Sequence, residues 1–354
     1  MTIYYPKSHY DKNHRSEVFP LLKPFVKGND FTDAQRVAMY GVSDQDFTIV
    51  DDIQEAEVCI LPMSWNYYLS TKQLPVALEF IEQAKVVGKK VWSFISGDHG
   101  VKHPEDDHVV VFRLGGYQSK HRSNHKGMPV FIGDYLLKNN LLDNYLPKTY
   151  SEQPLVGFCG QANGSKIQAG LDVIKKGCFN LKSLTGLSFY EPETLVPTSH
   201  LRAQLLQRLA HSEAIADQFI LRAQYRAGVT HGKDRHQTTL EFYNNILESQ
   251  YVLCVRGGGN FSVRFYETLM MGRIPVYIHT DGFLPLNDTI DWKHHVVWIE
   301  PDEQHKIAEK VLSFHSQLTA ESLKVLSESN RKLWEDKLRM KGFFLTVSGI
   351  IQNN

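Results

Sequence analysis

The residues best suited to chemistry lie in the stretch RGGGNFSVRFYE, from Arg256 to Glu267. Its three consecutive glycines, residues 257–259, have no Cβ atoms, so their backbone N–H groups can approach a ligand closely. A helix is expected to begin near Ser262, and the N–H groups and dipole at its start favour an anion. The guanidinium groups of Arg256 and Arg264 match phosphate oxygens in charge and in geometry. The segment therefore predicts an anion-binding loop.

Glu267 adds a carboxylate to this loop. It lies three residues after Arg264, so both side chains fall on one face of the expected helix. A carboxylate beside a phosphate site can accept hydrogen bonds from ribose hydroxyls, and the set fits a nucleotide diphosphate. The same residues also fit a surface ion pair beside a glycine turn. The loop matches neither the dinucleotide fingerprint GxGxxG nor a P-loop ending in GKS or GKT, so residue chemistry alone predicts no more than an anion site.

One glycine turn and two more cations are candidates for the same ligand. In the stretch LVGFCGQANGSK, residues 155–166, Gly160 lies in a turn between a predicted strand and a predicted helix. Lys166 begins that helix and Arg222 ends a short predicted strand, so each could reach a pyrophosphate. A packing turn and a solvated lysine explain the same pattern equally well.

Asp98 and His99 are candidates for a catalytic base. They belong to the stretch SGDHGV, which directly follows a predicted strand at residues 90–95. A carboxylate or an imidazole at the end of a strand can take a proton from an attacking hydroxyl group. The alternative is an Asp–His hydrogen bond that only shapes the loop.

A basic loop, KHRSNHK at residues 120–126, supplies candidates for a second ligand. His121 and His125 have a spacing that suits two zinc ligands on a helix, but the surrounding glycines oppose a helix, so no metal site is predicted. His121 and Arg122 are expected to contact an anionic acceptor or a phosphate, and a solvated loop is the alternative. Trp65 is expected to stack on an acceptor sugar, or else to belong to the core.

Alternating strands and helices are expected to position these residues, which is typical of α/β proteins. Strands are predicted at residues 2–5, 47–50, 57–61, 90–95, 108–112, 129–132, 155–159, 219–221, 251–255 and 274–278. Helices are predicted at residues 71–87, 165–176, 201–211, 238–248, 262–271, 304–316 and 320–340. The strand–helix–strand unit at 251–278 implies parallel strands with a right-handed crossover.

The polar segment 142–154, which contains two prolines, predicts a linker. We therefore expect two Rossmann-like domains facing a cleft, an N-terminal domain at 1–150 and a second domain at 151–320. The helix within 321–354 is expected to pack back on the first domain. Ligands in such sheets bind beyond the carboxyl ends of the strands, which places the site in the cleft.

Composition excludes several classes of protein. The 354 residues carry 39 basic and 39 acidic side chains, and a zero net charge argues against a nucleic-acid partner. No apolar run approaches the length of a transmembrane helix, and the first residues do not resemble a secretory signal. The four cysteines form no CxxC pair, and three lie in apolar runs, so we expect free thiols in a reducing, cytoplasmic compartment.

Residues 249–292 resemble the C-terminal signature of the exostosin-like glycosyltransferases, glycosyltransferase family 47. That signature combines a strand, an Arg-Gly pair, an arginine followed three residues later by an acid, and the sequence Gly-x-Ile-Pro-Val. Here these elements are residues 256–257, Arg264 with Glu267, and GRIPV at 272–276, and they are followed by LPLNDTIDW at 284–292. Arg273 stands where the family often has cysteine, and the upstream half is shorter and only weakly similar.

This resemblance implies a GT-B fold in which residues 1–150 form the acceptor-side domain and residues 151–320 the donor domain. It also implies an inverting sugar transfer, usually from a UDP-sugar, to a glycan or lipid-linked acceptor. It implies no cofactor and no metal bound through an Asp-x-Asp motif; residues 44–46 match that motif only in letters. Asp98 or His99 would be the base. The donor-side candidates are Gly160, Arg222, Arg256, Gly257, Gly258, Asn260, Ser262, Arg264 and Glu267.

Two other functions remain open. An α1,3-fucosyltransferase-like enzyme using GDP-fucose shares the glutamate before a Pro-Val strand, but it typically has Thr-Glu-Lys where this chain has Tyr266-Glu267-Thr268. A catalytically inactive relative that only binds a sugar or a nucleotide is the second alternative. Turnover of a labelled donor would separate it from an enzyme.

Overall fold

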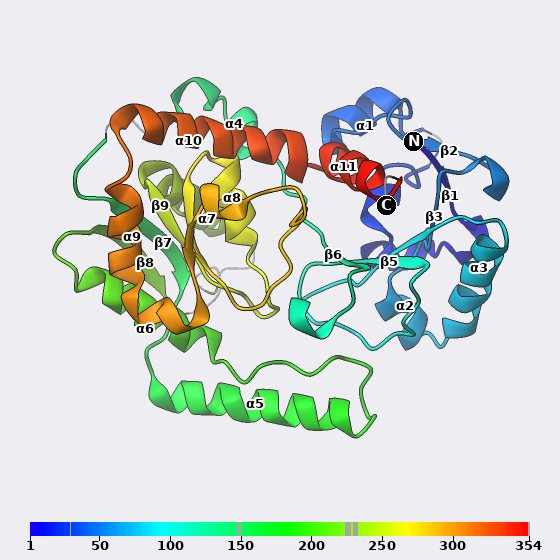
Figure 1. Cartoon of the computed structure of the whole chain (residues 1–354), viewed down its shortest axis with the longest axis horizontal. Coiled ribbons are helices and arrows are strands. Elements are labelled where there is room, and N and C mark those ends of the chain that lie inside the picture. Colours follow the sequence, from blue (N-terminus) through cyan, green and yellow to red (C-terminus); the bar gives the residue numbers. More distant parts are fainter. Residues whose placement is uncertain (29, 147–149, 224–227, 229–232, 353–354) are drawn as a thin grey trace.

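Two parallel β-sheets, one in each half of the chain, form the framework of the protein (Figure 1). The computed structural model describes residues 1–28, 30–146, 150–223, 228 and 233–352. The predicted α/β class with two Rossmann-like halves is confirmed. Part of the predicted linker, residues 147–149, lies outside the described residues.

The N-terminal sheet has the strand order β2-β1-β3-β4-β5-β6, and every neighbouring pair is parallel. Its strands are β1 (Thr2–Tyr4), β2 (Thr48–Ile49), β3 (Val58–Ile60), β4 (Val91–Phe94), β5 (Val109–Arg113) and β6 (His125–Gly127). The helices of this half are α1 (Asp33–Tyr40), α2 (Trp65–Ser70), α3 (Leu74–Val86) and α4 (Tyr135–Lys138). Strands β3, β4 and β5 are buried along their whole length, as expected of parallel strands covered on both faces.

The second sheet has the order β11-β10-β9-β7-β8 and is also parallel throughout. Its strands are β7 (Leu155–Gln161), β8 (Ala216–Arg222), β9 (Tyr251–Cys254), β10 (Ile274–Ile278) and β11 (Val297–Ile299). The helices are α5 (Lys166–Leu184), α6 (Thr198–Ala210), α7 (Lys233–Glu248), α8 (Val263–Met270) and α9 (Ile307–His315).

The order of the second sheet contains a topological switch point. The chain runs from β7 outward to β8, and then returns to β9 on the other side of β7. Connections that diverge in this way open a crevice at the carboxyl ends of the two central strands, which is where open α/β sheets bind ligands. The loops after β7 and β9 therefore border the expected site.

The C-terminal segment crosses from the second half to the first. Helix α10 (Ala320–Leu333) is followed by a π-type turn at Trp334–Leu338 and by α11 (Met340–Gln352) (Figure 1). Phe344 of α11 packs against Phe19 and Trp92 in the N-terminal core, with ring centroids 5.6 and 5.7 Å apart. The last helix thus covers the first sheet. Among the described residues, no helix has both the length and the apolar character needed to cross a membrane.

Two element predictions have to be corrected. Residues 129–132 form no strand; the sixth strand of the first sheet is β6, inside the basic loop, where His125 pairs with Val111. Pro129 has no N–H to donate to a strand ladder, which explains why pairing ends before it. The helix predicted at 71–87 is α3, which begins only at Leu74; residues 71–73 form a turn after α2, in which Lys72 has a φ of 59°.

Candidate functional site

A cavity of about 600 Å³ lies between the two halves of the chain. Its walls are the carboxyl ends of β7, β8 and β9, one side of α7, the start of α8, and Asp98 from the loop after β4. It therefore occupies the crevice that the strand order predicts. Of the predicted donor-side residues, those that line the cavity are Gly160, Arg222, Gly257, Gly258, Ser262, Arg264 and Glu267.

Arg264 lines this cavity and is held there by backbone carbonyls. Its Nη2 donates to the Cys159 oxygen at 2.7 Å, and its guanidinium lies 4.2 Å from the centre of the Phe158 ring. Its buried Nε has no hydrogen-bond partner. Within the described ranges no carboxylate lies within 4 Å of it in an ion pair, and burial lowers the pKa of the guanidinium. A positive charge in this setting is matched to an anion that enters the cavity.

Arg202 of α6 is a second such cation, and the sequence did not point to it. It lines the same cavity and donates to the carbonyl oxygens of Gln161, at 3.2 Å, and Arg256, at 2.6 Å. Burial, and then repulsion from Arg264, lower the pKa of Arg202 to about 10. Its surroundings, SHLRAQ, look like any amphipathic helix, so no sequence signal could have found it.

Gly160 makes room for Arg264. A Cβ atom at position 160 would lie 2.6 Å from the Arg264 Nη2 atom, which is closer than two such atoms can approach. The glycine at the end of β7 is thus a requirement of the arginine's position, and not merely a packing turn.

The glycine loop after β9 contacts the loop that carries Asp98. A Cβ atom at Gly258 would lie 2.8 Å from Asp98 Oδ2, and one at Gly259 would lie 2.2 Å from the Asp98 carbonyl oxygen. Only glycines allow the two loops to come this close. The Asp98 carboxylate consequently lies against the β9–α8 loop, where both line the cavity.

The start of α8 supplies the remaining polar groups. Ser262 is its N-cap residue, makes no capping hydrogen bond and lines the cavity. Glu267, one turn further along, accepts a hydrogen bond of 3.4 Å from the Tyr243 hydroxyl. Arg222 is also at the cavity, but it forms an ion pair with Glu241, so its charge is already partly neutralised.

Arg256 has a different environment from the one predicted. Its side chain points away from the cavity and forms a buried ion pair of 2.8 Å with Glu193. Its Nη1 also donates to the Tyr117 hydroxyl at 2.9 Å. The expectation that Arg256 binds phosphate directly has to be corrected: this arginine joins the two halves of the chain.

Glu193 is the centre of this buried cluster. Burial alone would raise its pKa, but hydrogen bonds from His99, Tyr117 and Arg256 outweigh that effect and hold the pKa at about 2. His99 approaches Glu193 at 3.3 Å through Nδ1 and does not line the cavity. Of the two base candidates, Asp98 alone faces the site.

Two more predicted residues are structural. Asn260 is buried and donates to the carbonyl oxygens of Gly116, at 2.8 Å, and Thr280, at 2.7 Å, so it fixes the glycine loop instead of lining the cavity. Trp65 is 1% exposed and donates to Ser93, which excludes the predicted stacking on a sugar.

The predicted acceptor residues His121 and Arg122 border a separate hollow of about 320 Å³. His121 Nε2 lies 2.9 Å from Arg113 Nη1, and Arg122 forms an exposed ion pair with Asp107. Neither residue reaches the cavity that holds Arg264.

The segment of the chain that contributes most of this site is similar to known proteins. Residues 192–313 match the family model of the Exostosin GT47 domain. The Exostosin-1 homolog of Caenorhabditis elegans is 31% identical over 99 residues, which are 28% of this chain and 25% of that protein. The probable glucuronosyltransferase GUT1 of Oryza sativa subsp. japonica is 26% identical over 91 residues, 26% of this chain and 22% of that protein.

The chain thus matches about a quarter of the length of these relatives. Among solved structures, TarM is similar over 75% of this chain and 51% of its own, with 11% identity and a TM-score of 0.37. The fold described above rests on the strand pairings themselves. The matched segment contains β8, β9, α8 and β10, and with them Arg202, Arg264 and Glu267. The resemblance predicted from the sequence is therefore confirmed over residues 192–313, which match the Exostosin GT47 domain.

Proposed function

We propose that the chain is a glycosyltransferase that binds the diphosphate of a nucleotide sugar in the cavity between its halves. The observation that carries this proposal is the pair Arg202 and Arg264. Both guanidinium groups line the cavity, both are held by backbone carbonyls, and both have a buried Nε without a hydrogen-bond partner. Two like charges arranged in this way fit a diphosphate, which carries negative charge on several oxygens.

The reaction proposed is a single displacement at the anomeric carbon of the donor sugar. The acceptor hydroxyl oxygen forms a bond to that carbon while the bond to the diphosphate oxygen breaks, so the configuration inverts. Asp98, which faces the glycine loop, takes the hydroxyl proton. Arg202, Arg264 and the N–H groups at the start of α8 stabilise the charge that develops on the leaving diphosphate.

The remaining assignments follow from this placement. Glu267 would accept hydrogen bonds from the ribose hydroxyls, beside Tyr243 and one turn from the diphosphate. Because arginines supply the positive charge at the leaving group, we propose transfer without a metal ion in the donor cavity. A UDP-sugar donor and a glycan or lipid-linked acceptor, in the cytoplasm, complete the proposal.

Nucleotide binding tests the proposal directly. Thermal unfolding would be followed with UDP, GDP, CMP and dTDP, because a ligand at a hundredfold excess over its Kd stabilises the folded state by roughly 2.7 kcal/mol. We expect UDP to raise Tm, and we expect Arg264→Ala and Arg202→Ala each to abolish most of the rise. Arg122→Ala, which removes an exposed arginine outside the cavity, is the matched control and should behave as wild type.

Each other outcome has a definite meaning. Stabilisation by GDP alone would favour the fucosyltransferase-like alternative. Stabilisation by UDP without turnover of any UDP-sugar would indicate an inactive binding relative. If no nucleotide raises Tm, the assignment of Arg202 and Arg264 to a donor site is wrong.

A further inference from the structure

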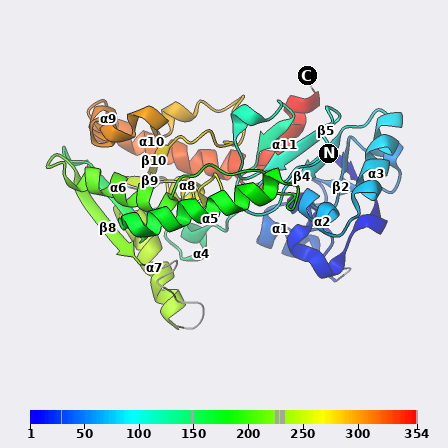
Figure 2. The same ribbon diagram turned by 90° about the horizontal axis from the view of Figure 1, so that it is seen from below.

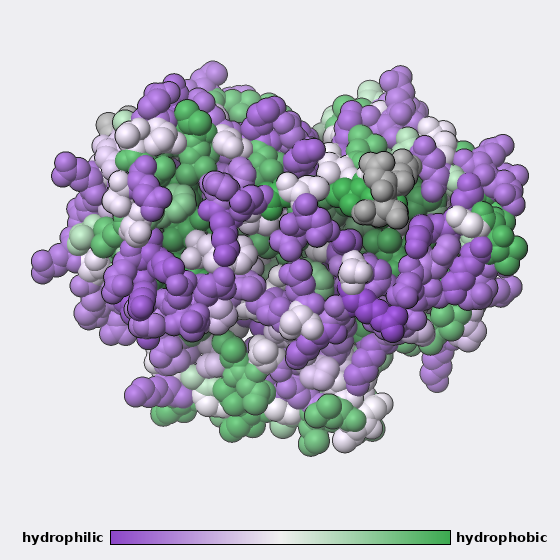
Figure 3. Space-filling model, in the orientation of Figure 1, coloured by the Kyte–Doolittle hydropathy of each residue, from purple (hydrophilic) through white to green (hydrophobic). Residues whose placement is uncertain are grey.

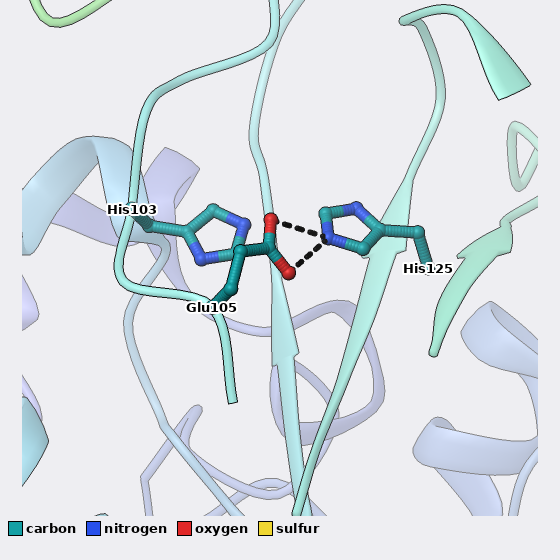
Figure 4. Close-up of side chains that lie close together, drawn as sticks. All are labelled: His103, Glu105 and His125. Carbon is teal, nitrogen blue, oxygen red and sulfur yellow. Dashed lines mark hydrogen bonds and ion pairs between the residues drawn. The ribbon is translucent and has the colours of Figure 1, made fainter. Parts of the chain in front are cut away.

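A cluster of two histidines and one glutamate lies in the N-terminal half, outside the donor cavity. His103 and Glu105 belong to the loop between β4 and β5, and His125 belongs to β6. Each residue has one ligand atom within 4.8 Å of those of the other two. Figure 4 shows the Glu105 carboxylate between the two imidazole rings. The pairing of His125 with Val111 on β5 brings the edge strand to this loop.

The hydrogen bonds of His103 leave one ring nitrogen available. Its Nδ1 lies 2.9 Å from the carbonyl oxygen of Pro104, which can only accept, so Nδ1 carries the proton. Its Nε2 is then an acceptor; it is buried and has no hydrogen-bond partner. Trp65 stacks on the ring at 4.8 Å and holds its orientation. A neutral imidazole whose other nitrogen donates to a carbonyl is the form in which histidine binds metal ions.

His125 and Glu105 are already spaced as two ligands of one ion. His125 Nε2 lies 3.2 and 3.3 Å from the two carboxylate oxygens. Zinc bonds of 2.0–2.1 Å in a tetrahedron place neighbouring ligand atoms roughly 3.4 Å apart. The separation of these two residues therefore fits, and His103, whose ligand atom lies within 4.8 Å of theirs, would need to approach by at most about 1.4 Å.

Arg113 lies beside the cluster, at the opposite ring nitrogen of His125. Its Nη1 lies 3.3 Å from His125 Nδ1, 3.3 Å from Glu191 and 2.9 Å from His121. Because Nη1 has two hydrogens for three neighbours, the contact with His125 can be released. Its charge is paired with Glu191 at 2.6 Å, which limits repulsion of a bound cation.

We propose that His103, Glu105 and His125 bind a divalent zinc ion. Two imidazoles and a carboxylate with a water in the fourth position are a donor set that zinc accepts in a tetrahedral site. The ion would replace the proton between His125 and Glu105 and would use the unpartnered Nε2 of His103. It would tie the β4–β5 loop, which also carries Asp98, to strand β6. None of the three ligands lines the donor cavity, so the site is separate from the proposed sugar transfer.

Zinc binding by the full-length chain tests this site without reference to activity. After removal of metal with a chelator, the protein would be titrated with ZnCl2 by calorimetry and with Co²⁺ by visible absorption. We expect one ion per chain and the intense absorption of tetrahedral Co²⁺. His103→Ala and Glu105→Gln should each weaken binding by at least about tenfold, whereas His294→Ala, an exposed histidine elsewhere, should leave it unchanged.

The variants must also remain folded. Glu105 is exposed, so Glu105→Gln is expected to unfold at the wild-type temperature in the absence of metal. Absence of zinc binding by the folded wild-type chain would overturn the proposal. So would an unchanged Kd in both His103→Ala and Glu105→Gln, because zinc would then be bound elsewhere.

Helix α5 carries an independent feature, an exposed apolar stripe. Ile167, Leu171, Ile174, Cys178 and Leu181 follow the i, i+4, i+7, i+11, i+14 spacing of one helix face, and all five are exposed. In Figures 1 and 2 this helix lies along the outside of the molecule, and in Figure 3 hydrophobic side chains gather there along the lower edge. Soluble surfaces rarely expose a continuous stripe of this kind without an interaction partner.

The lysines beside this apolar stripe indicate what kind of surface it would bind. Lys175 and Lys182 are exposed and flank it, four residues after Leu171 and Cys178, and Lys166 begins the helix. The one acid of the helix, Asp172, accepts a hydrogen bond from Gln168. A second copy would bring like charges together, whereas an anionic bilayer matches them. The geometry points to α5 lying in the surface of an anionic membrane, with its lysines reaching the headgroups.

Co-sedimentation with vesicles tests this second inference. The full chain should bind vesicles that contain phosphatidylglycerol more strongly than vesicles of phosphatidylcholine, and added salt should weaken the binding. Ile174→Asp combined with Leu181→Asp should abolish it, and Val86→Asp, at an even more exposed apolar residue of α3, should not. Absence of binding to anionic vesicles, or a dimer that the double variant dissociates, would overturn it.

Discussion

At the level of single residues, the four arginines in and around the cavity differ in the groups that neutralise their charge. Arg222 and Arg256 have carboxylate partners, Glu241 and Glu193, whereas Arg202 and Arg264 are held by carbonyl oxygens. Burial lowers the pKa of the latter two, because nothing in the described ranges compensates fully for the lost hydration. The two arginines that lack carboxylates are therefore the ones suited to a diphosphate.

Asp98→Asn tests the proposed base. The amide keeps the size of the side chain and its place beside Gly258, but it cannot accept the acceptor's proton. We expect kcat to fall by about 10²–10⁴ while the Kd of the nucleotide changes little. Single-turnover measurements of sugar transfer, with binding measured separately, check this. A kcat within a few fold of wild type would exclude Asp98 as the base.

At the scale of elements, the site depends on short loops at a switch point of the sheet. The loops after β7 and β9 meet because the chain leaves β7 for β8 and returns on the other side. Gly160 and the glycines after β9 then allow the backbone to approach Arg264 and Asp98 closely. The glycines in this region leave the space that the neighbouring side chains occupy.

Gly160→Ala is the corresponding prediction. The added methyl group would lie 2.6 Å from Arg264 Nη2, so the guanidinium must leave its position beside the Cys159 carbonyl. We expect about a tenfold loss of UDP affinity, or about 1.4 kcal/mol, measured by calorimetry. Gly170→Ala, on α5 with open space around it, is the control and should keep wild-type affinity. Equal affinities in the two variants would contradict the role of Gly160.

At the scale of the whole molecule, a buried polar cluster joins the two halves. Glu193 contacts Arg256 of the second half and both His99 and Tyr117 of the first. Helix α11 adds an apolar contact by packing Phe344 on the N-terminal core. These contacts connect the two halves that border the cavity.

The pH dependence of stability tests this cluster. Glu193 has its pKa depressed from 4.5 to about 2, so its ionised form stabilises the fold above pH 4.5, and that contribution is lost as the pH falls toward 2. Glu193→Gln should therefore be less stable than wild type at neutral pH, by up to about 3 kcal/mol. The difference should shrink between pH 4.5 and 2 in urea unfolding. A difference that is constant across this range would show that the charge of Glu193 is not responsible.

Most strands and helices of this protein, and the local chemistry of its glycine loop, could be predicted from the sequence. Strand β10 has the predicted bounds, Ile274–Ile278, and the glycine loop, Arg264 and Glu267 are where their spacing places them, since strand and helix periods act over neighbouring residues. The alternation of strands and helices likewise predicted the α/β fold with two sheets.

The contacts between groups that are distant in the chain could not be predicted and became visible in the folded structure. Arg202 lines the cavity from α6. Glu193 forms an ion pair with Arg256 and a hydrogen bond with His99, and Trp65 is buried against the ring of His103. The short distances among His103, Glu105 and His125 likewise depend on the pairing register of β5 and β6. Such contacts join residues far apart in the chain, and they depend on packing and desolvation, which no local pattern encodes.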